Sequence, residues 1–265
     1  SLDYCENLDL SQALPIIGKL HKIKYLALKS YKIPKEIHFL KNIEHLSIQK
    51  VCREEFVDIS PYLQYLSHLK SLSFSDCGLK EIPNWLSKLK NLESLLLGEN
   101  PIQNLPANIG DLKNLKYLYL SKTNIKKLPQ SLSKLHHLEE IELDFIPNLN
   151  IQSVFKVIGH LPKIKKLYLS ASTKFPPKIG EMPYLEDLII DSDYKTKQVI
   201  PNSISNIKNL CFLRLRFASI LELSEGLAKL SKLETLRIET KKIILPKNFG
   251  ELENLKELNL SNCNI

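Results

Sequence analysis

Glycine is scarce in this sequence, with only 8 glycines among 265 residues. None of them stands in a G-x-G-x-x-G or G-x-x-x-x-G-K-[ST] pattern, the patterns with which a backbone loop holds phosphate groups. The G-x-S-x-G and H-E-x-x-H patterns of nucleophilic and zinc-dependent hydrolases are missing too. We therefore predict no nucleotide-binding loop, no cofactor and no enzymatic activity.

Cysteine is also sparse and scattered. The five cysteines stand at positions 5, 52, 77, 211 and 263, so they form neither a C-x-x-C motif nor a cluster with metal-ligand spacing. We interpret them as structural thiols and predict no metal site. An odd number of dispersed thiols favours a reducing intracellular compartment.

Long apolar runs are missing as well. No stretch reaches the roughly 18 apolar residues that a membrane helix needs, so we predict no membrane span. The N-terminus lacks the charged-then-apolar pattern of a signal peptide. Because the chain starts at Ser1 rather than at Met, bacterial export stays open as an alternative to an intracellular location.

Acidic residues are outnumbered, with 29 acidic against 37 basic side chains and a net charge of +8. Such a balance raises the hypothesis of a nucleic acid or another polyanion as partner. Most of the excess is lysine scattered through turn segments, such as Lys19, Lys88 and Lys134, where solvated lysine is the ordinary outcome. We therefore do not expect nucleic acid to be the partner.

A repeat fills the chain from end to end. The spacing L-x-x-L-x-x-L-x-L recurs at intervals of 18 to 26 residues, with other apolar residues replacing some leucines. Its third apolar residue is found at Leu8, Leu26, Leu46, Leu72, Leu95, Leu118, Ile141, Leu167, Leu188, Leu213, Leu236 and Leu258. The twelve copies predict one continuous array.

Each copy has two halves with different periods. Residues 117–121, Y-L-Y-L-S, alternate apolar and polar side chains as a half-buried strand does. The segment P-A-N-I-G-D-L-K-N-L opens with proline and continues with apolar residues three to four apart, which suits a short helical or 3₁₀ turn. One strand and one outer turn make a coil that can bury its leucine face only against neighbouring coils.

Residues 89–109, L-K-N-L-E-S-L-L-L-G-E-N-P-I-Q-N-L-P-A-N-I, resemble the leucine-rich repeat family. The outer halves LPANIGDLKNL, LPQSLSKLHHL and LPKNFGELENL are similar to those of bacterial, plant immune-receptor and intracellular scaffold members. The resemblance implies an α/β solenoid: a horseshoe with about twelve parallel strands on its concave face and short helices, 3₁₀ turns and loops on its convex face. We expect residues 1–265 to form a single leucine-rich repeat domain that is truncated or uncapped at its C-terminus.

The chain departs from the family pattern at the position where an asparagine links neighbouring coils. Only Asn100 holds that position among the twelve copies. We expect less regular curvature around residues 30–55 and 145–220, where residues that cannot donate such bonds replace it. Two long copies, at residues 53–66 and 150–161, are predicted to carry true α-helices on the outer face.

Side chains beside the L-x-L leucines should face solvent on the inner side of the sheet. In the early copies these are small and polar, as at Ser47, Ser73 and Ser94, and in the later copies they are aromatic and charged. Three of the four arginines fall on this face, and Tyr and Arg are enriched in binding hot spots. The predicted binding residues are Tyr117, Tyr119, Glu140, Glu142, Asp144, Tyr168, Asp187, Ile189, Phe212, Arg214, Arg216 and Arg237.

Two other interpretations of this face stay open. Its carboxylates could do acid-base work or bind Ca²⁺, but an open sheet lacks the desolvated pocket that such chemistry needs. Its charges could instead simply pair across strands and support the sheet.

The sequence favours a non-catalytic module that binds a protein or peptide on its concave face, as a monomer. The partner should be basic towards the middle of the array and acidic towards its C-terminal end. The alternatives are a ligand-sensing or targeting domain of a larger multidomain protein, or a bacterial host-interaction protein.

Overall fold

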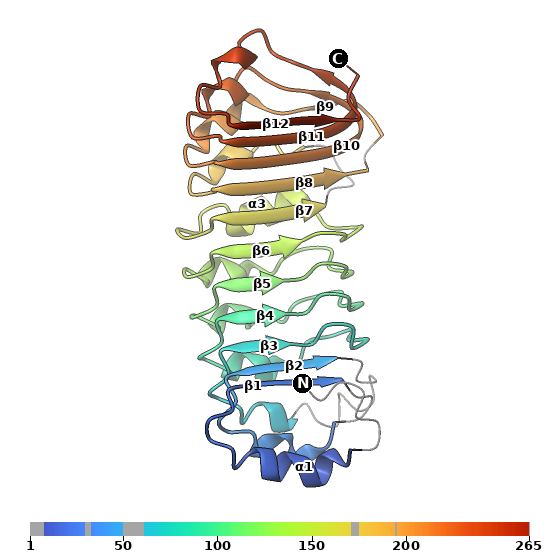
Figure 1. Ribbon diagram of the computed structural model, residues 1–265, viewed down its shortest axis with the longest axis vertical. Helices are drawn as coiled ribbons and strands as arrows, with labels where there is room; N and C mark the ends of the chain where they lie inside the picture. Colours follow the sequence, from blue (N-terminus) through green and yellow to red (C-terminus); the bar gives the residue numbers. More distant parts are fainter. Residues whose placement is uncertain (1–7, 30–32, 50–60, 171–174, 194, 265) are drawn as a thin grey trace. The chain divides into compact units, whose positions relative to one another are not determined.

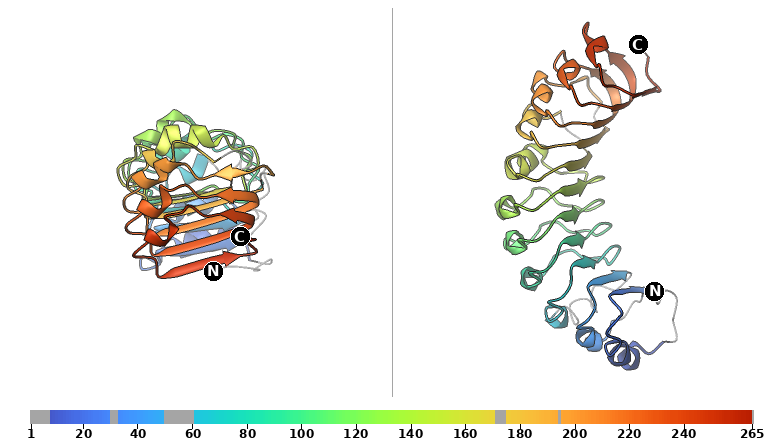
Figure 2. Two further views of the ribbon diagram at one scale, coloured as in Figure 1. Left: turned by 90° about the horizontal axis from the view of Figure 1, so that it is seen from above. Right: turned by 60° about the vertical axis from the view of Figure 1, so that its left-hand side comes forward.

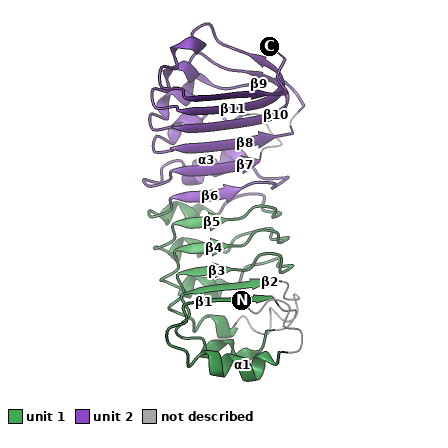
Figure 3. Cartoon of the chain, in the orientation of Figure 1, with its two compact units in different colours: residues 1–125, 129–138 green, residues 126–128, 139–265 purple. Residues whose placement is uncertain are grey.

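The computed structural model describes residues 8–29, 33–49, 61–170, 175–193 and 195–264 (Figure 1). They divide into two compact units, shown in Figure 3. Unit 1 comprises residues 1–125 and 129–138, and unit 2 comprises residues 126–128 and 139–265. Within each unit, strands form one side of the stacked coils and short helices form the other (Figure 2).

Unit 1 contains a helix, five strands and four 3₁₀ helices within its described residues. In chain order they are α1 (Leu10–Ile17), β1 (Tyr25–Lys29), η1 (Lys35–Phe39), β2 (His45–Gln49), β3 (Ser71–Ser73), η2 (Asn84–Lys88), β4 (Ser94–Leu96), η3 (Ile109–Asp111), β5 (Tyr117–Tyr119) and η4 (Gln130–Lys134). Strands β1 to β5 pair in parallel in chain order.

Unit 2 repeats this plan with longer strands. Its elements are β6 (Glu140–Leu143), α3 (Ile151–Ile158), β7 (Lys166–Ser170), η5 (Ile179–Glu181), β8 (Asp187–Ser192), β9 (Gln198–Val199), η6 (Asn202–Asn206), β10 (Phe212–Glu222), η7 (Leu227–Lys229), β11 (Thr235–Ile244), η8 (Phe249–Glu251) and β12 (Glu257–Ser261). The parallel order is β6-β7-β8-β10-β11-β12, with β9 paired to the end of β10.

The predicted register is confirmed by the strand pairing. In unit 1 the third apolar residues of the template lie opposite one another from Leu26 to Leu118, and in unit 2 from Ile141 to Leu258. Nearly all of these side chains are buried. Because side chains alternate along a strand, the residues on either side of each leucine are turned to the opposite face.

Proline sets the start of the outer turns, as the sequence predicts. Pro83, Pro129 and Pro201 precede η2, η4 and η6 with extended backbone angles. Each proline carbonyl then accepts the first 3₁₀ hydrogen bond, for example from the N–H of Leu86 at 3.1 Å. Proline has no N–H of its own to leave unpaired at this position.

Asn100 makes the inter-coil bonds expected of it. Its side-chain Nδ2 donates to the carbonyl oxygens of Phe74 and Leu97, and its Oδ1 accepts from the N–H groups of Cys77 and Leu79. A second set of asparagines bonds to neighbouring coils from another position of the repeat. Asn91 and Asn114, just before the strands, each donate to a carbonyl of the preceding coil, and so do their equivalents Asn42, Asn209 and Asn254.

A row of alternating charges borders the amino ends of the strands. In unit 1 it runs Lys24, Glu44, Lys70, Glu93 and Lys116, with ion pairs of 3.0 Å (Lys24–Glu44), 2.6 Å (Lys70–Glu44) and 2.8 Å (Lys116–Glu93). Hydrogen bonds from Lys70 and Lys24 lower the pKa of Glu44 to about 2. In unit 2 the equivalent residues are Lys165, Glu186, Cys211, Glu234 and Lys256.

Cys211 interrupts this alternation between Glu186 and Glu234. Burial raises the pKa of its thiol, and the two glutamates raise it further. Cys211→Lys should therefore raise the free energy of unfolding by about 0.5 kcal/mol at low salt, the size of a surface ion pair. Denaturant melts with Cys211→Ala as control would measure it, and a gain that survives in about 1 M salt would contradict the ion-pair explanation.

Some features differ from the sequence predictions. The first template copy gives no strand within the described residues, because Leu8 is 39% exposed and α1 begins at Leu10. Asp9 stabilises that helix start, since its carboxylate accepts from the N–H of Ser11 at 2.9 Å. The described residues nevertheless form the twelve strands that were predicted, with β9 as the strand that the template did not anticipate.

The long template copies and the later strands agree only in part with the sequence predictions. Helix α3 confirms the outer helix predicted at residues 150–161, whereas most of the one predicted at residues 53–66 lies outside the described residues. Strands β10 and β11 extend over 11 and 10 residues, longer than the template implies. They continue because burial keeps alternating beyond the L-x-L pair, through Phe217, Ser219 and Leu221.

Candidate functional site

The exposed face of unit 2 carries side chains in three rows that cross its strands. The first row is Glu140, Lys166, Asp187, Phe212, Thr235 and Glu257. The middle row is Glu142, Tyr168, Ile189, Arg214, Arg237 and Asn259. The third row is Ser170, Asp191, Arg216, Glu239 and Ser261, and Asp144 precedes it directly after β6.

The twelve predicted binding residues are thus divided between the two units. Tyr117 and Tyr119 lie on β5 of unit 1, half-buried, on the face opposite to the buried Leu118. The other ten belong to unit 2, and all of them are at least partly exposed. One expectation about the early strands is wrong, because Ser73 is only 8% exposed.

Several charges of the face pair across strands. Lys166 binds Asp187 at 3.1 Å, and Arg216 binds Asp191 at 2.8 Å. Arg237 binds Glu257 at 2.8 Å and lies over the Phe212 ring. The alternative that opposite charges support the sheet therefore holds for two of the three arginines.

Arg214 is the exception among them. It lies in the middle row between Ile189 and Arg237, and it makes no hydrogen bond or ion pair with any other described residue. Tyr168, two strands away in the same row, likewise keeps its hydroxyl without a described hydrogen-bond partner. An arginine fork and a tyrosine hydroxyl are therefore available to a partner on this face.

Asp144 is a half-buried carboxyl group with no cation bound to it. Its Oδ1 is buried and has no hydrogen-bond partner among the described residues. Burial, followed by the charges of Glu142 and Asp191, raises its pKa from the ordinary 3.8 to about 6, against the opposing effect of Arg214 and Arg216. The negative charges around Asp144 therefore outweigh the two arginines nearby.

This raised pKa predicts a pH-dependent effect of Asp144→Asn. Because the folded state raises this pKa, the ionised form of Asp144 lowers the free energy of unfolding. This loss of stability is absent below about pH 4, where the carboxyl group is protonated, and complete only above about pH 6. Without solvent screening, this pKa shift corresponds to about 3 kcal/mol of unfolding free energy. Because the carboxyl group is partly exposed, we expect Asp144→Asn to raise the free energy of unfolding by about 1 kcal/mol at pH 8. Urea melts at pH 8 and near pH 4 would measure the difference, and an equal effect at both values would refute it.

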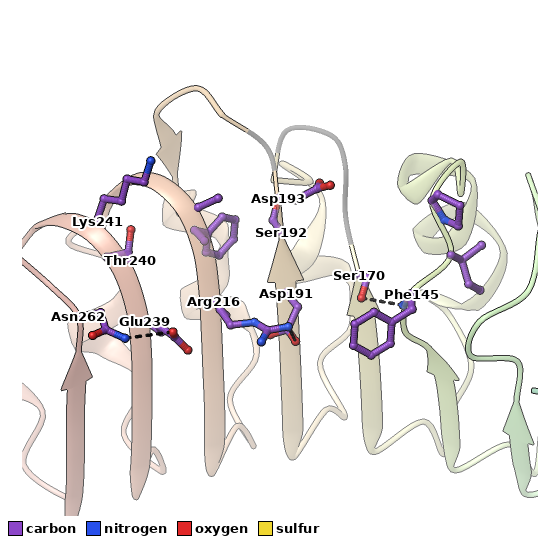
Figure 4. A pocket seen from close by; sticks show the side chains of 14 residues that line it. Phe145, Ser170, Asp191, Ser192, Asp193, Arg216, Glu239, Thr240, Lys241 and Asn262 are labelled. Carbon is purple, nitrogen blue, oxygen red and sulfur yellow. Dashed lines mark hydrogen bonds and ion pairs between the residues drawn. The ribbon is translucent and has the colours of Figure 1, made fainter. Parts of the chain in front are cut away.

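A hollow of about 660 Å³ lies at the carboxyl ends of the strands of unit 2 (Figure 4). Its walls are formed by Phe145, Ile146, Pro147, Ser170, Asp191, Ser192, Asp193, Arg216, Phe217, Ala218, Glu239, Thr240, Lys241 and Asn262. Of the twelve predicted binding residues, only Arg216 lines the hollow. The sequence analysis therefore missed this hollow. At four lining positions, Ile146, Asp193, Ala218 and Lys241, the chain lacks the asparagine that links neighbouring coils in the family pattern. This departure was the signal that could have located the hollow.

Two kinds of site are not found in the described part of the chain. No group of three or more His, Cys, Asp or Glu side chains there has an arrangement that could hold a metal ion. Among the same residues, no helix has both the length and the apolar character needed to cross a bilayer.

Comparison with known families decides the classification. A profile described as a leucine-rich repeat region matches residues 107–200, and a profile of a Leucine Rich Repeat matches residues 68–89. The chain is a leucine-rich repeat protein. A search of curated proteins gave no match.

Solved structures show the same leucine-rich repeat fold. An internalin, InlF from Listeria monocytogenes, is 16% identical with a TM-score of 0.64, over 97% of this chain and 89% of the internalin chain. TLR13, solved with ssRNA13, is 24% identical with a TM-score of 0.74, over 96% of this chain and 38% of its own. PEPR1, solved with AtPEP1, is 22% identical with a TM-score of 0.62, over 94% and 40%.

Proposed function

We propose that this leucine-rich repeat protein is a non-catalytic interaction module that binds a protein or peptide on the exposed face of its strands. The ten predicted residues of unit 2 form the proposed contact, and Tyr117 and Tyr119 of unit 1 stay a separate prediction for that unit. The observation that carries the proposal is the middle row, where Arg214 and Tyr168 lack partners among the described residues. The PEPR1 structure, which contains AtPEP1, supports a peptide ligand.

The charge of the face argues for a protein rather than a nucleic acid. The three rows and Asp144 contain seven carboxylates but only four cations, although the whole chain has a net charge of +8. A surface with this excess of negative charge repels phosphate groups. The ssRNA13 bound by TLR13 keeps RNA as the alternative to test.

A second candidate function is a sensing or targeting domain of a larger protein. The chain spans about two fifths of the PEPR1 and TLR13 chains that it resembles. The length of the complete open reading frame would decide between the two, because a longer frame with a catalytic or switch domain favours the second.

Affinity capture tests the proposal. The intact chain and its Tyr168→Ala/Arg214→Ala variant would be immobilised side by side and incubated with lysate from the source cells. Proteins retained by the intact chain but not by the variant support it. Equal retention by both proteins would contradict binding at this face. Retention of RNA that falls steeply with added salt would favour the nucleic-acid alternative instead.

A further inference from the structure

Phe145 has an unusual backbone angle for a large side chain. Five of the described turns after a strand contain a non-glycine residue with positive φ, and at Asp76, Glu99, Lys122 and Asn262 that residue is polar. At Phe145 the same left-handed angle, φ 53°, is taken by a large aromatic side chain. A bulky residue is disfavoured there, and asparagine and aspartate tolerate the position best.

Burial does not explain the phenylalanine. Its side chain is 56% exposed, so it gains little from the hydrophobic effect in the protein alone. The turn itself is held firmly, since the N–H of Phe145 donates to the Ser170 hydroxyl at 2.8 Å. Figure 4 shows the ring beside Ser170 at the edge of the hollow, and Pro147 also lines the hollow.

Carboxylates lie across the hollow from this apolar edge. Asp191 uses one oxygen to bind Arg216, while its Oδ1 is buried without a described hydrogen-bond partner. Asp193 makes no hydrogen bond or ion pair with another described residue, and Glu239 accepts only an amide hydrogen bond, from Asn262 at 3.2 Å. Among the described lining residues, Lys241 is the one cation besides Arg216.

We propose that this hollow anchors a peptide segment in which a basic side chain stands next to an apolar one. The apolar side chain contacts Phe145 and Pro147, where it shields the exposed ring from water. The ammonium or guanidinium group pairs with the carboxylates of Asp193 and Glu239, which line the hollow and form no ion pair with another described residue. This inference rests on the proposed function, because it names the chemistry of a segment of the same partner.

The charge of the whole face points to the same partner. Because Asp191 and Glu257 already neutralise Arg216 and Arg237, the C-terminal end of the face has no excess of positive charge. Arg214 is the one cation of the three rows without an ion pair to a described residue, so the partner needs an acceptor group opposite Arg214, while a basic segment fits the hollow.

A phage library of random peptides, selected on the intact chain, tests the anchor. Phe145→Asn removes the ring and leaves a residue that suits the left-handed turn, and Asp193→Asn removes a negative charge from the hollow and keeps the side-chain shape. Asp76→Asn is the matched control, since it changes the equivalent turn of unit 1. Arg214→Ala tests the rest of the face independently.

The expected result is enrichment of peptides with adjacent basic and apolar residues. Both hollow variants should retain them at least about tenfold less well than the intact chain, whereas Asp76→Asn retains them fully. Peptides that bind both hollow variants as well as the intact chain but lose binding to Arg214→Ala would overturn the anchor and leave the proposed function standing. If no peptide is enriched over a blank surface, both proposals fail.

Discussion

Replacing Leu118 by alanine should lower the free energy of unfolding by about 2 to 5 kcal/mol. Leu118 lies at the centre of β5, opposite Leu95 of β4, and its side chain is 0% exposed. Removing it loses apolar burial and leaves a cavity that the stacked coils cannot close completely. Because each coil is stabilised by its neighbours, hydrogen exchange should also quicken in the adjoining strand β4.

Leu258→Ala is a matched control for this effect. Leu258 occupies the same template position on β12, but its side chain is 46% exposed, so we expect a loss below about 1 kcal/mol. Urea unfolding of both variants would measure the difference. A loss of less than about 1 kcal/mol for Leu118→Ala, or equal losses for the two, would mean that the leucines do not form a buried ladder.

Replacing Arg214 by alanine should weaken partner binding by about 2 kcal/mol, close to thirtyfold in Kd. Its guanidinium group has no described partner in the free protein, so all of its donors are available to a ligand. Arg237 is already bound to Glu257 at 2.8 Å, and a ligand would have to compete with that carboxylate. We therefore expect Arg237→Ala to weaken binding less than Arg214→Ala.

Isothermal titration with a partner identified by capture would measure both variants. The free energy of unfolding of Arg214→Ala should stay within about 0.5 kcal/mol of the intact chain, as for other exposed side chains. A larger loss of affinity for Arg237→Ala than for Arg214→Ala would show that the paired arginines carry the contact.

The periodic part of the structure could be predicted from the sequence. The L-x-L spacing fixed the face on which each side chain lies, because a slip of one residue would bury Tyr168 and expose Leu167. The regular spacing of the copies then placed Leu26 to Leu118, and Ile141 to Leu258, in register within their units. Such repetition makes one copy informative about the next.

The rest of the site depends on details that periodicity does not contain. Whether Arg216 pairs with Asp191 depends on rotamers and on competing partners, although the register shows that the two are neighbours. The exposure of Phe145 follows from a left-handed turn that the sequence marks only weakly. The pKa of Asp144 depends on its burial and on charged side chains of β6, β8 and β10, and no local sequence pattern reveals the contributions of β8 and β10.

The proposed binding face is tested most directly by one pair of titrations. The Tyr168→Ala/Arg214→Ala variant changes the middle row of unit 2, and Ser47→Ala/Ser94→Ala changes two half-buried serines on the equivalent face of unit 1. We predict that the first variant loses at least about thirtyfold in affinity for the captured partner while the second binds like the intact chain. Full affinity of the first variant together with a loss in the second would contradict binding at the unit 2 face.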